Sequence, residues 1–248
     1  MHTDNPSQVA RAALELRELL LRGKFRPGER LREVPLASQL GVSRIPLRLA
    51  LERLGHEGLL EVRPTRGFVV PRFSLTDIYD AIELRGVLEG TAARLSSERL
   101  REAGEVQLMR TQSHAMAKLL RRRKLTLDYL AQYAELNQAF HTELLRLSRS
   151  RTLRRAMEQA CSLPFSSPSA FLRRQHIDPE ARDLFLIAVD QHQEIVDAIA
   201  NREGMRAETL AREHARLARR NLDLALRTGS TKGDLLKLVP GGKLIQLP

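Results

Sequence analysis

Apolar residues recur at helical spacing near the start of the chain, and they predict three helices in the first 56 residues. The first runs from about Ser7 to Arg22, with Ser7 as its cap. The second is short, covers residues 36–40 and ends at Gly41. Ser43 can cap the third, which runs to about His56. A sharp turn at Gly41 between two short helices is typical of a helix-turn-helix.

Two β-like runs follow the third helix, at residues 59–63 and 67–70. Residues 64–66 include a proline and join the runs closely enough to predict a hairpin. Helix, short helix, tight turn, helix and hairpin in about 70 residues is the order of a winged helix-turn-helix. We therefore expect a DNA-binding domain over residues 1–73, with a plausible linker at 71–74.

The rest of the chain, from residue 76 to about 228, carries the helical pattern almost throughout. A break with two prolines interrupts it at residues 162–169. The predicted helices cover residues 76–96, 99–123, 126–148, 150–161, 180–201 and 206–228. The sequence thus predicts a mainly α protein, with an all-α helical-bundle domain at 76–228; the tail, 229–248, is left unassigned.

Composition agrees with this fold, and the charge indicates a polyanionic binding partner. Aromatic residues are only 4% of the chain and Trp is absent, while the abundant Leu, Ala, Arg and Glu favour helix. The formal net charge of +11 points to a polyanion, although a basic excess can also serve solubility alone. Charge per residue is roughly twice as high over residues 1–73 as in the rest, so we expect the polyanion there.

The cysteine count and the absence of long apolar runs bear on the compartment. Cys161 is the only cysteine, so no intrachain disulfide can form, which indicates a reducing environment. No apolar run reaches the roughly 18 residues that a membrane span needs. The first residues lack the basic and apolar regions of a signal peptide. We expect a cytoplasmic protein with no membrane partner.

The third predicted helix has the pattern of a recognition helix. Its apolar positions can pack inward, while Ser43, Arg44 and Arg48 face outward near its N-terminal end. Arg can pair with two acceptors of guanine, and Ser can reach a phosphate or a base edge. By spacing alone, a basic amphipathic helix in an ordinary bundle stays an alternative. The positions expected to pack inward are Val42, Leu47, Ala50, Leu51 and Leu54.

The same stretch resembles the signature of the GntR family of bacterial regulators. The matching residues are Leu36, Ala37, Leu40, Gly41, Val42, Ser43, Arg44, Pro46, Arg48, Ala50, Leu51, Leu54, Gly58 and Leu59. The resemblance implies that Ser43, Arg44 and Arg48 contact the operator, and that Arg66 and Gly67 form a wing tip near the minor groove. Two residues depart from the family: Ile45 replaces the usual Thr, and Leu49 replaces the usual Glu.

Histidines in the helical half suggest a metal site. His192 and His214 lie equally far, 11 residues, on either side of Glu203 in the turn between two predicted helices. At about 1.5 Å per residue, both lie roughly 16 Å from that turn, so they would face each other in an antiparallel hairpin. Asn137 and His141 share one face of an earlier helix. Three converging imidazoles suit Zn, Ni or a similar ion, whereas a single His is more often an ordinary surface or hydrogen-bonded residue.

This half also resembles the FadR-type ligand-binding domain known as FCD, over residues 76–228. The residues that carry the resemblance are Glu83, Leu84, Arg85, Leu88, Glu89, Asn137, His141, His192 and His214. It implies a divalent metal, Zn with Ni or Mn as alternatives, held by Asn137, His141, His192 and His214. It also implies a small carboxylate or sugar-acid effector, for which Arg85 is a candidate counter-ion, the alternative being a solvated helix charge. Asn137 replaces the commoner Asp and is a poorer ligand, so three His with water or effector is the safer expectation.

The function expected from these features is an effector-responsive, homodimeric transcription regulator without enzymatic activity. A metal-free ligand-responsive regulator is one alternative, and a zinc-dependent hydrolase is another from a different class, because three His with an open position also describe catalytic zinc. No His-Glu-x-x-His, Gly-x-Ser-x-Gly or phosphate-loop motif supports an enzyme. An architectural nucleoid protein would leave the histidines unexplained.

Overall fold

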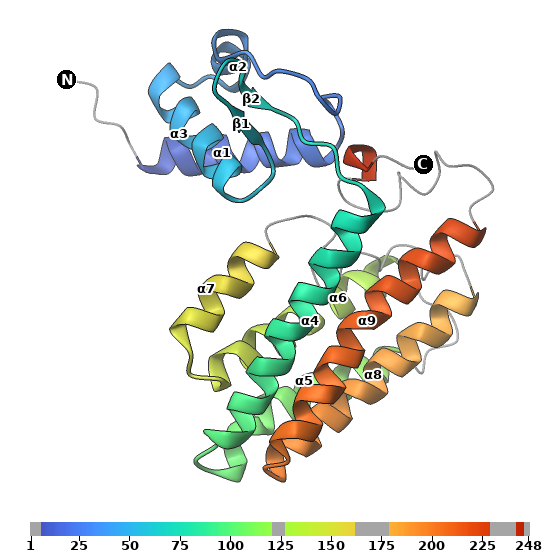
Figure 1. Cartoon of the computed structure of the whole chain (residues 1–248). Coiled ribbons are helices and arrows are strands. Elements are labelled where there is room, and N and C mark those ends of the chain that lie inside the picture. Colours follow the sequence, from blue (N-terminus) through green and yellow to red (C-terminus); the bar gives the residue numbers. More distant parts are fainter. Residues whose placement is uncertain (1–5, 121–126, 162–178, 229–241, 246–248) are drawn as a thin grey trace.

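The computed structural model describes residues 6–120, 127–161, 179–228 and 242–245. Figure 1 shows two parts, an N-terminal unit with a small hairpin and a bundle of longer helices beneath it. The chain is therefore mainly helical, with a winged helix-turn-helix followed by an all-helical domain, which confirms the predicted fold class. No helix in the described ranges is both long and apolar enough to cross a membrane.

The N-terminal unit contains three helices and one antiparallel hairpin. The helices are α1 (Pro6–Leu21), α2 (Glu33–Leu40) and α3 (Arg44–His56). The strands β1 (Glu61–Arg63) and β2 (Gly67–Val69) pair with Val62 opposite Phe68. Gly41, between α2 and α3, has a left-handed backbone (φ 60°), a conformation that costs glycine little. The turn that the sequence predicted at Gly41 is thus present.

Two helix starts differ from their predicted positions. The helix α1 begins at Pro6, so Ser7 lies inside its first turn, and the expectation that Ser7 caps it is wrong. Proline suits the first helical position because its missing N–H would have no partner within the helix. The helix α2 begins at Glu33, three residues before the predicted Leu36. The first turn of α2 carries little apolar periodicity, so the sequence pattern did not reveal it.

The bundle is built from six α-helices and one short 3₁₀ helix in the described residues. A capping box starts α4 directly after the linker: the Ser74 hydroxyl accepts from the Asp77 N–H, and the Asp77 carboxylate accepts from the Ser74 N–H. The elements are α4 (Leu75–Glu98), η1 (Ala103–Val106), α5 (Gln107–Leu120), α6 (Leu127–Leu147), α7 (Arg151–Ala160), α8 (Pro179–Ala200) and α9 (Gly204–Thr228).

The helix predicted at 99–123 is divided in the structure. Glu102 has an extended backbone (φ −132°, ψ 144°), and α5 starts only after η1. Leu100 and Val106, on either side of that break, are both buried. The apolar spacing therefore continues across the break, and the sequence pattern did not reveal it. The break predicted at residues 162–169 lies outside the described residues.

Two glycines bring α4 and α9 close together, side by side along the bundle (Figure 1). A Cβ atom at Gly86 would lie 3.1 Å from the Cβ of Ala215, and one at Gly90 only 2.8 Å from Cγ of Arg212. Gly86 and Gly90 are one turn apart, so they form a flat strip along α4. This close approach sets α4 directly against the part of α9 that carries His214.

Candidate DNA-reading face and metal centre

The helix α3 presents a polar face at its N-terminal end. Its side chains alternate as predicted: Ser43, Arg44 and Arg48 are exposed, while the apolar face is buried. Ser43 has an extended backbone and precedes the helix as its N-cap residue. The buried side chains on the opposite face are Pro46, Leu47, Ala50, Leu51 and Leu54. The N-terminal end of α3 can therefore approach a nucleic acid without uncovering the core.

The remaining residues of this face are also accessible. Arg48 pairs with Glu52 one turn later, with 3.3 Å between Nε and Oε1, and both side chains stay largely in solvent. Ile45 and Leu49, the two departures from the family signature, are exposed beside the arginines. In the hairpin, Arg66 and Gly67 are exposed, and Gly67 has a positive φ of 67°. The structure thus places all five predicted DNA contacts at the surface, on α3 and on the hairpin turn.

Three histidines from three different helices meet inside the bundle. His141 comes from α6, His192 from α8 and His214 from α9, and one ligand atom from each lies within 4.8 Å of the others. The ring centres of His192 and His214 are 4.3 Å apart. The turn between α8 and α9 occupies residues 201–203, which brings the two histidines to the same height, as their symmetric spacing predicted.

Two of these histidines, His192 and His214, are held in their neutral form by their surroundings. Burial, followed by the neighbouring imidazoles of His214 and His141, lowers the pKa of His192 well below its ordinary value. Burial, followed by His141, lowers the pKa of His214 to about 3. Neutral imidazole is the form that coordinates a metal ion. These two side chains therefore need no deprotonation before binding one near neutral pH.

Buried nitrogens of this cluster lack hydrogen-bond partners among the described residues. They are both ring nitrogens of His141 and of His192, and Nδ1 of His214; of these, Nδ1 of His141 faces the Glu89 carboxylate. A buried polar atom without a partner costs free energy, so such atoms are rare in folded proteins unless something else satisfies them. A bound cation would satisfy several of them together, so the donor set fits a divalent metal that accepts nitrogen ligands.

Glu89 on α4 orients one of these rings. Its Oε1 lies 3.0 Å from Nδ1 of His141, and the side chain is only 3% exposed. Despite burial, the charges of His141 and Arg85 lower the pKa of Glu89 to about 2, so it is a carboxylate. A carboxylate that accepts from one ring nitrogen of a histidine directs the other toward a ligand. Here it leaves Nε2 of His141 free to face the centre of the cluster.

The two other predicted site residues are buried near the histidines. Asn137 lies one turn before His141 on α6. Arg85 is 3% exposed, and its guanidinium donates to the Ala215 carbonyl on α9, at 3.1 Å. The alternative of a solvated charge on a helix surface is therefore wrong for Arg85. The sequence analysis left this alternative open because the burial of Arg85 depends on α9 packing closely over Gly86 and Gly90, which lie next to it on α4.

A cavity of about 420 Å³ adjoins the cluster between α4, α6 and α7. Its volume is in the range of small-molecule sites. Glu89 and His141 belong to its wall, together with two arginines, Arg146 and Arg154, and the thiol of Cys161. Burial raises the pKa of that thiol to about 11. The remaining lining residues are Gln138, Thr142, Leu145, Met157 and Glu158.

Sequence reasoning missed the roles of Glu89 and of α7. Glu89 was used only as part of the family resemblance, although an acidic residue one turn after Arg85, on a helix with Gly86 and Gly90, is a signal of an interior position. The contribution of α7 to the cavity has no comparable signal. Its side chains become neighbours of His141 only through tertiary packing.

Comparisons with known proteins agree with both parts of the fold. The family model described as bacterial regulatory proteins, gntR family, matches residues 8–70, and the FCD domain model matches residues 80–217. The Nta operon transcriptional regulator of Aminobacter aminovorans is 34% identical over 179 residues, which are 72% of this chain and 77% of that protein. The Glc operon transcriptional activator of Escherichia coli K12 is 26% identical over 227 residues, or 85% and 87% of the two chains.

Solved structures share the fold. The structure of E. coli McbR/YncC superposes with a TM-score of 0.55 at 24% identity and covers 90% of this chain and 99% of that one. A structure of Lar from Listeria monocytogenes gives a TM-score of 0.60 at 17% identity, with 90% and 100% covered. Together with the family matches, these findings show that the chain belongs to the GntR family and is a bacterial helix-turn-helix transcription regulator with a C-terminal FCD domain.

Proposed function

We propose that operator binding by this regulator is controlled by a small organic acid that binds beside a divalent metal ion in the helical domain. The observation that carries the proposal is the meeting of His141, His192 and His214, with unpartnered buried nitrogens, next to a cavity that His141 lines. In this assignment residues 1–73 bind DNA, residues 76–228 sense the effector, and the tail, 229–248, is given no role.

In the DNA-binding domain, Arg44 and Arg48 read base edges in the major groove, and Ser43 contacts a phosphate or base edge. Their exposure at the N-terminal end of α3 supports these roles. Arg66 and Gly67 at the hairpin turn approach the minor groove. A glycine at that turn leaves the backbone free to come close to the DNA.

In the sensor domain, His141, His192 and His214 hold the metal ion, with Asn137 as a weaker ligand. Zn is the expected ion, and Ni or Mn are alternatives, since all three accept imidazole nitrogen. When bound, the ion supplies positive charge and a coordination position for an oxygen of the effector. Glu89 fixes the ring of His141, and burial keeps His192 and His214 neutral and ready to bind.

The cavity supports an acidic effector. Arg146 and Arg154 line it and can pair with a carboxylate, while Leu145 and Met157 offer apolar surface for a short carbon chain. Arg85 lies deeper, beside Glu89, and contributes as a counter-ion to the negative charge of the site. Burying a carboxylate in a helical core without such partners would cost too much free energy.

Ligand binding can reach the DNA-binding domain through α4. This helix begins at the linker, next to the DNA-binding domain, and carries Arg85 and Glu89 at the sensor site (Figure 1). A change of packing around Glu89 can therefore tilt α4 and move the domain attached to it, biasing one of two arrangements. The regulator acts in the cytoplasm as a homodimer on a near-palindromic operator, since two recognition helices double the base contacts of one.

We assign no catalytic residues to this chain. The curated relatives reported above carry the names of transcription regulators, which favours regulation over zinc-dependent hydrolysis for the histidine cluster. A regulator with a metal-free effector pocket is the other candidate, and the experiment below separates the two.

The proposal is tested by operator binding. The probe is the DNA upstream of the regulator's own gene, and binding is measured with and without a panel of small dicarboxylic, hydroxy and sugar acids. One acid should change the affinity about 5- to 150-fold, the usual size of allosteric coupling. The effect should disappear after metal removal and in a His192→Ala/His214→Ala variant. An effect that persists in both would identify a metal-free effector pocket.

A further inference from the structure

The C-terminal segment lies outside both family matches, which cover residues 8–70 and 80–217, yet part of it is packed into the protein. Gly242–Leu244 forms a short 3₁₀ helix, η3. Leu244 is 0% exposed and Ile245 is 6% exposed. Two adjacent side chains buried to this extent indicate that the segment packs at a defined place on the protein rather than by a chance contact.

The backbone of this segment pairs with the linker between the two domains. The Phe73 N–H donates to the Leu244 carbonyl at 3.0 Å, and Phe73 and Ile245 form a parallel β-bridge. Phe73 is itself buried, although it lies in the predicted linker. The linker is therefore bridged to residues about 170 positions later in the sequence.

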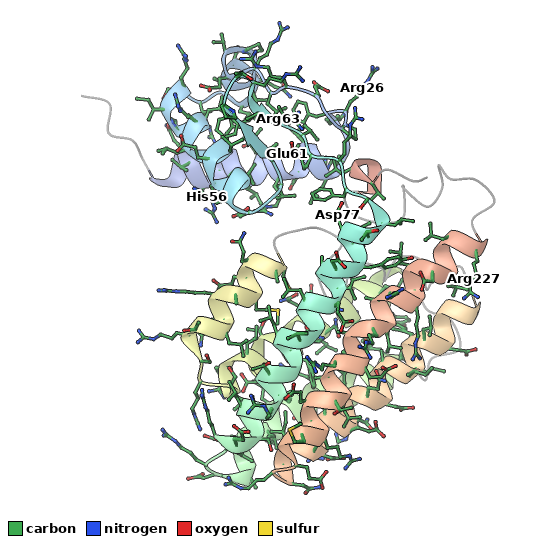
Figure 2. The ribbon with its side chains drawn as sticks, in the orientation of Figure 1. Arg26, His56, Glu61, Arg63, Asp77 and Arg227 are labelled. Carbon is green, nitrogen blue, oxygen red and sulfur yellow. The ribbon has the colours of Figure 1, made fainter. Side chains whose placement is uncertain are left out.

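The side chains of the segment enter a core that both domains share. Leu244 and Ile245 belong to the same apolar cluster as Leu16 of α1, Ile78 of α4 and Leu222 of α9. In Figure 1, η3 lies at the junction, between the end of α1 and the start of α4. Asp77, labelled in Figure 2, marks the start of α4 at this junction. The segment thus contacts elements on both sides of the linker at once.

We propose that Leu244 and Ile245 form an intramolecular clasp, which packs into the apolar cluster shared by the DNA-binding and helical domains and fixes their relative orientation. The occupant is the chain's own tail. The thirteen residues 229–241 join it to the end of α9, and a chain of that length spans up to roughly 45 Å.

The clasp has a consequence for regulation. The linker has only four residues, 71–74, and a linker alone leaves considerable freedom between domains. With the clasp in place, α1 of the DNA-binding domain and the linker are both packed against α4 and α9 through Leu244 and Ile245. Movements of α4 and α9 are therefore transmitted directly to the DNA-binding domain. Without the clasp, the flexible linker would transmit only part of the same movements to the DNA-binding domain.

Amide hydrogen exchange tests the clasp in the full-length protein. The variant Leu244→Ser/Ile245→Ser is compared with wild type and with Met205→Ser, which removes an apolar side chain that is already exposed on α9. Since burial of one large apolar side chain shifts an equilibrium by roughly tenfold or more, exchange of the Phe73 amide should accelerate at least that much in the double variant. Peptides from the core of α8 should keep their protection. Unchanged exchange at Phe73 would overturn the proposal.

A cross-link gives an answer that does not depend on the stability of the serine variant. Cysteines replace the bridge partners, Phe73→Cys and Ile245→Cys, in a Cys161→Ser background. Oxidation should give a disulfide within one chain, seen as a faster-migrating monomer on a non-reducing gel. The matched pair Phe73→Cys and Met205→Cys should give none. Absence of a cross-link in the first pair, or a disulfide that joins two chains, would overturn an intramolecular clasp.

Discussion

Acidification should destabilise the metal-free protein through two histidines of the bundle, the buried His192 and the half-buried His214. The folded state keeps both neutral, with the pKa of His214 lowered to about 3 and that of His192 well below 6.5, mainly by burial. The unfolded chain binds a proton at each with a pKa of about 6.5. As the pH falls below 6.5, the unfolded state binds more protons than the folded state, so the free energy of unfolding decreases.

The size of the effect follows from these pKa values. Between pH 8 and pH 5, a histidine that titrates at about 6.5 when unfolded and at about 3 when folded lowers the free energy of unfolding by about 2 kcal/mol. His192, which is fully buried and also has its pKa lowered, changes the stability in the same direction, so the loss for the pair is about 2 kcal/mol or more. The loss stops only when the pH reaches the folded pKa.

Urea unfolding, followed by circular dichroism in the presence of a chelator at several pH values, measures this loss. The variant His192→Gln/His214→Gln cannot take up the two protons and should lose at least about 2 kcal/mol less than wild type over the same range. His114 is exposed, so His114→Gln serves as the matched control and should behave like wild type. Equal pH dependence in wild type and the double variant would refute the reasoning.

Three further predictions concern DNA, the metal and assembly. Replacement of Arg44 or Arg48 by Ala should cost about 1–3 kcal/mol on the true operator and less on random DNA; equal losses in a gel-shift assay would mean that the residue contacts only phosphate. Glu89→Gln keeps the shape of the side chain but removes the charge that orients His141, so metal affinity measured by calorimetry should fall about 10- to 100-fold; unchanged affinity would exclude that role. Sedimentation should show a homodimer, both free and on DNA, and a monomer in both conditions would contradict the proposed operator geometry.

The parts of the fold set by local spacing could be predicted from the sequence. The turn at Gly41, the exposed arginines of α3 and the hairpin follow from residue pattern over a few positions. The pairing of His192 and His214 was also predictable, because two antiparallel helices joined by a short turn bring symmetric positions together. These features depend on few contacts between distant segments, so the local sequence is enough to predict them.

The features that depend on packing between distant segments could not be predicted. The burial of Arg85 requires α9 to lie over the glycine strip of α4, and the cavity requires α7 to lie against α6. The tail was left unassigned because its two buried residues, Leu244 and Ile245, have no periodic pattern around them. Their burial depends on an apolar cluster with side chains of α1, α4 and α9, which exists only in the folded chain.

Metal analysis of the protein, purified without a His tag and reconstituted with Zn, tests the central claim most directly. His141, His192 and His214 form one cluster, so wild type should retain about one ion per chain after removal of free metal. The His192→Ala/His214→Ala variant should retain almost none, because a single remaining imidazole binds too weakly. A wild type that holds no metal, or a double variant that holds as much as wild type, would contradict the metal centre.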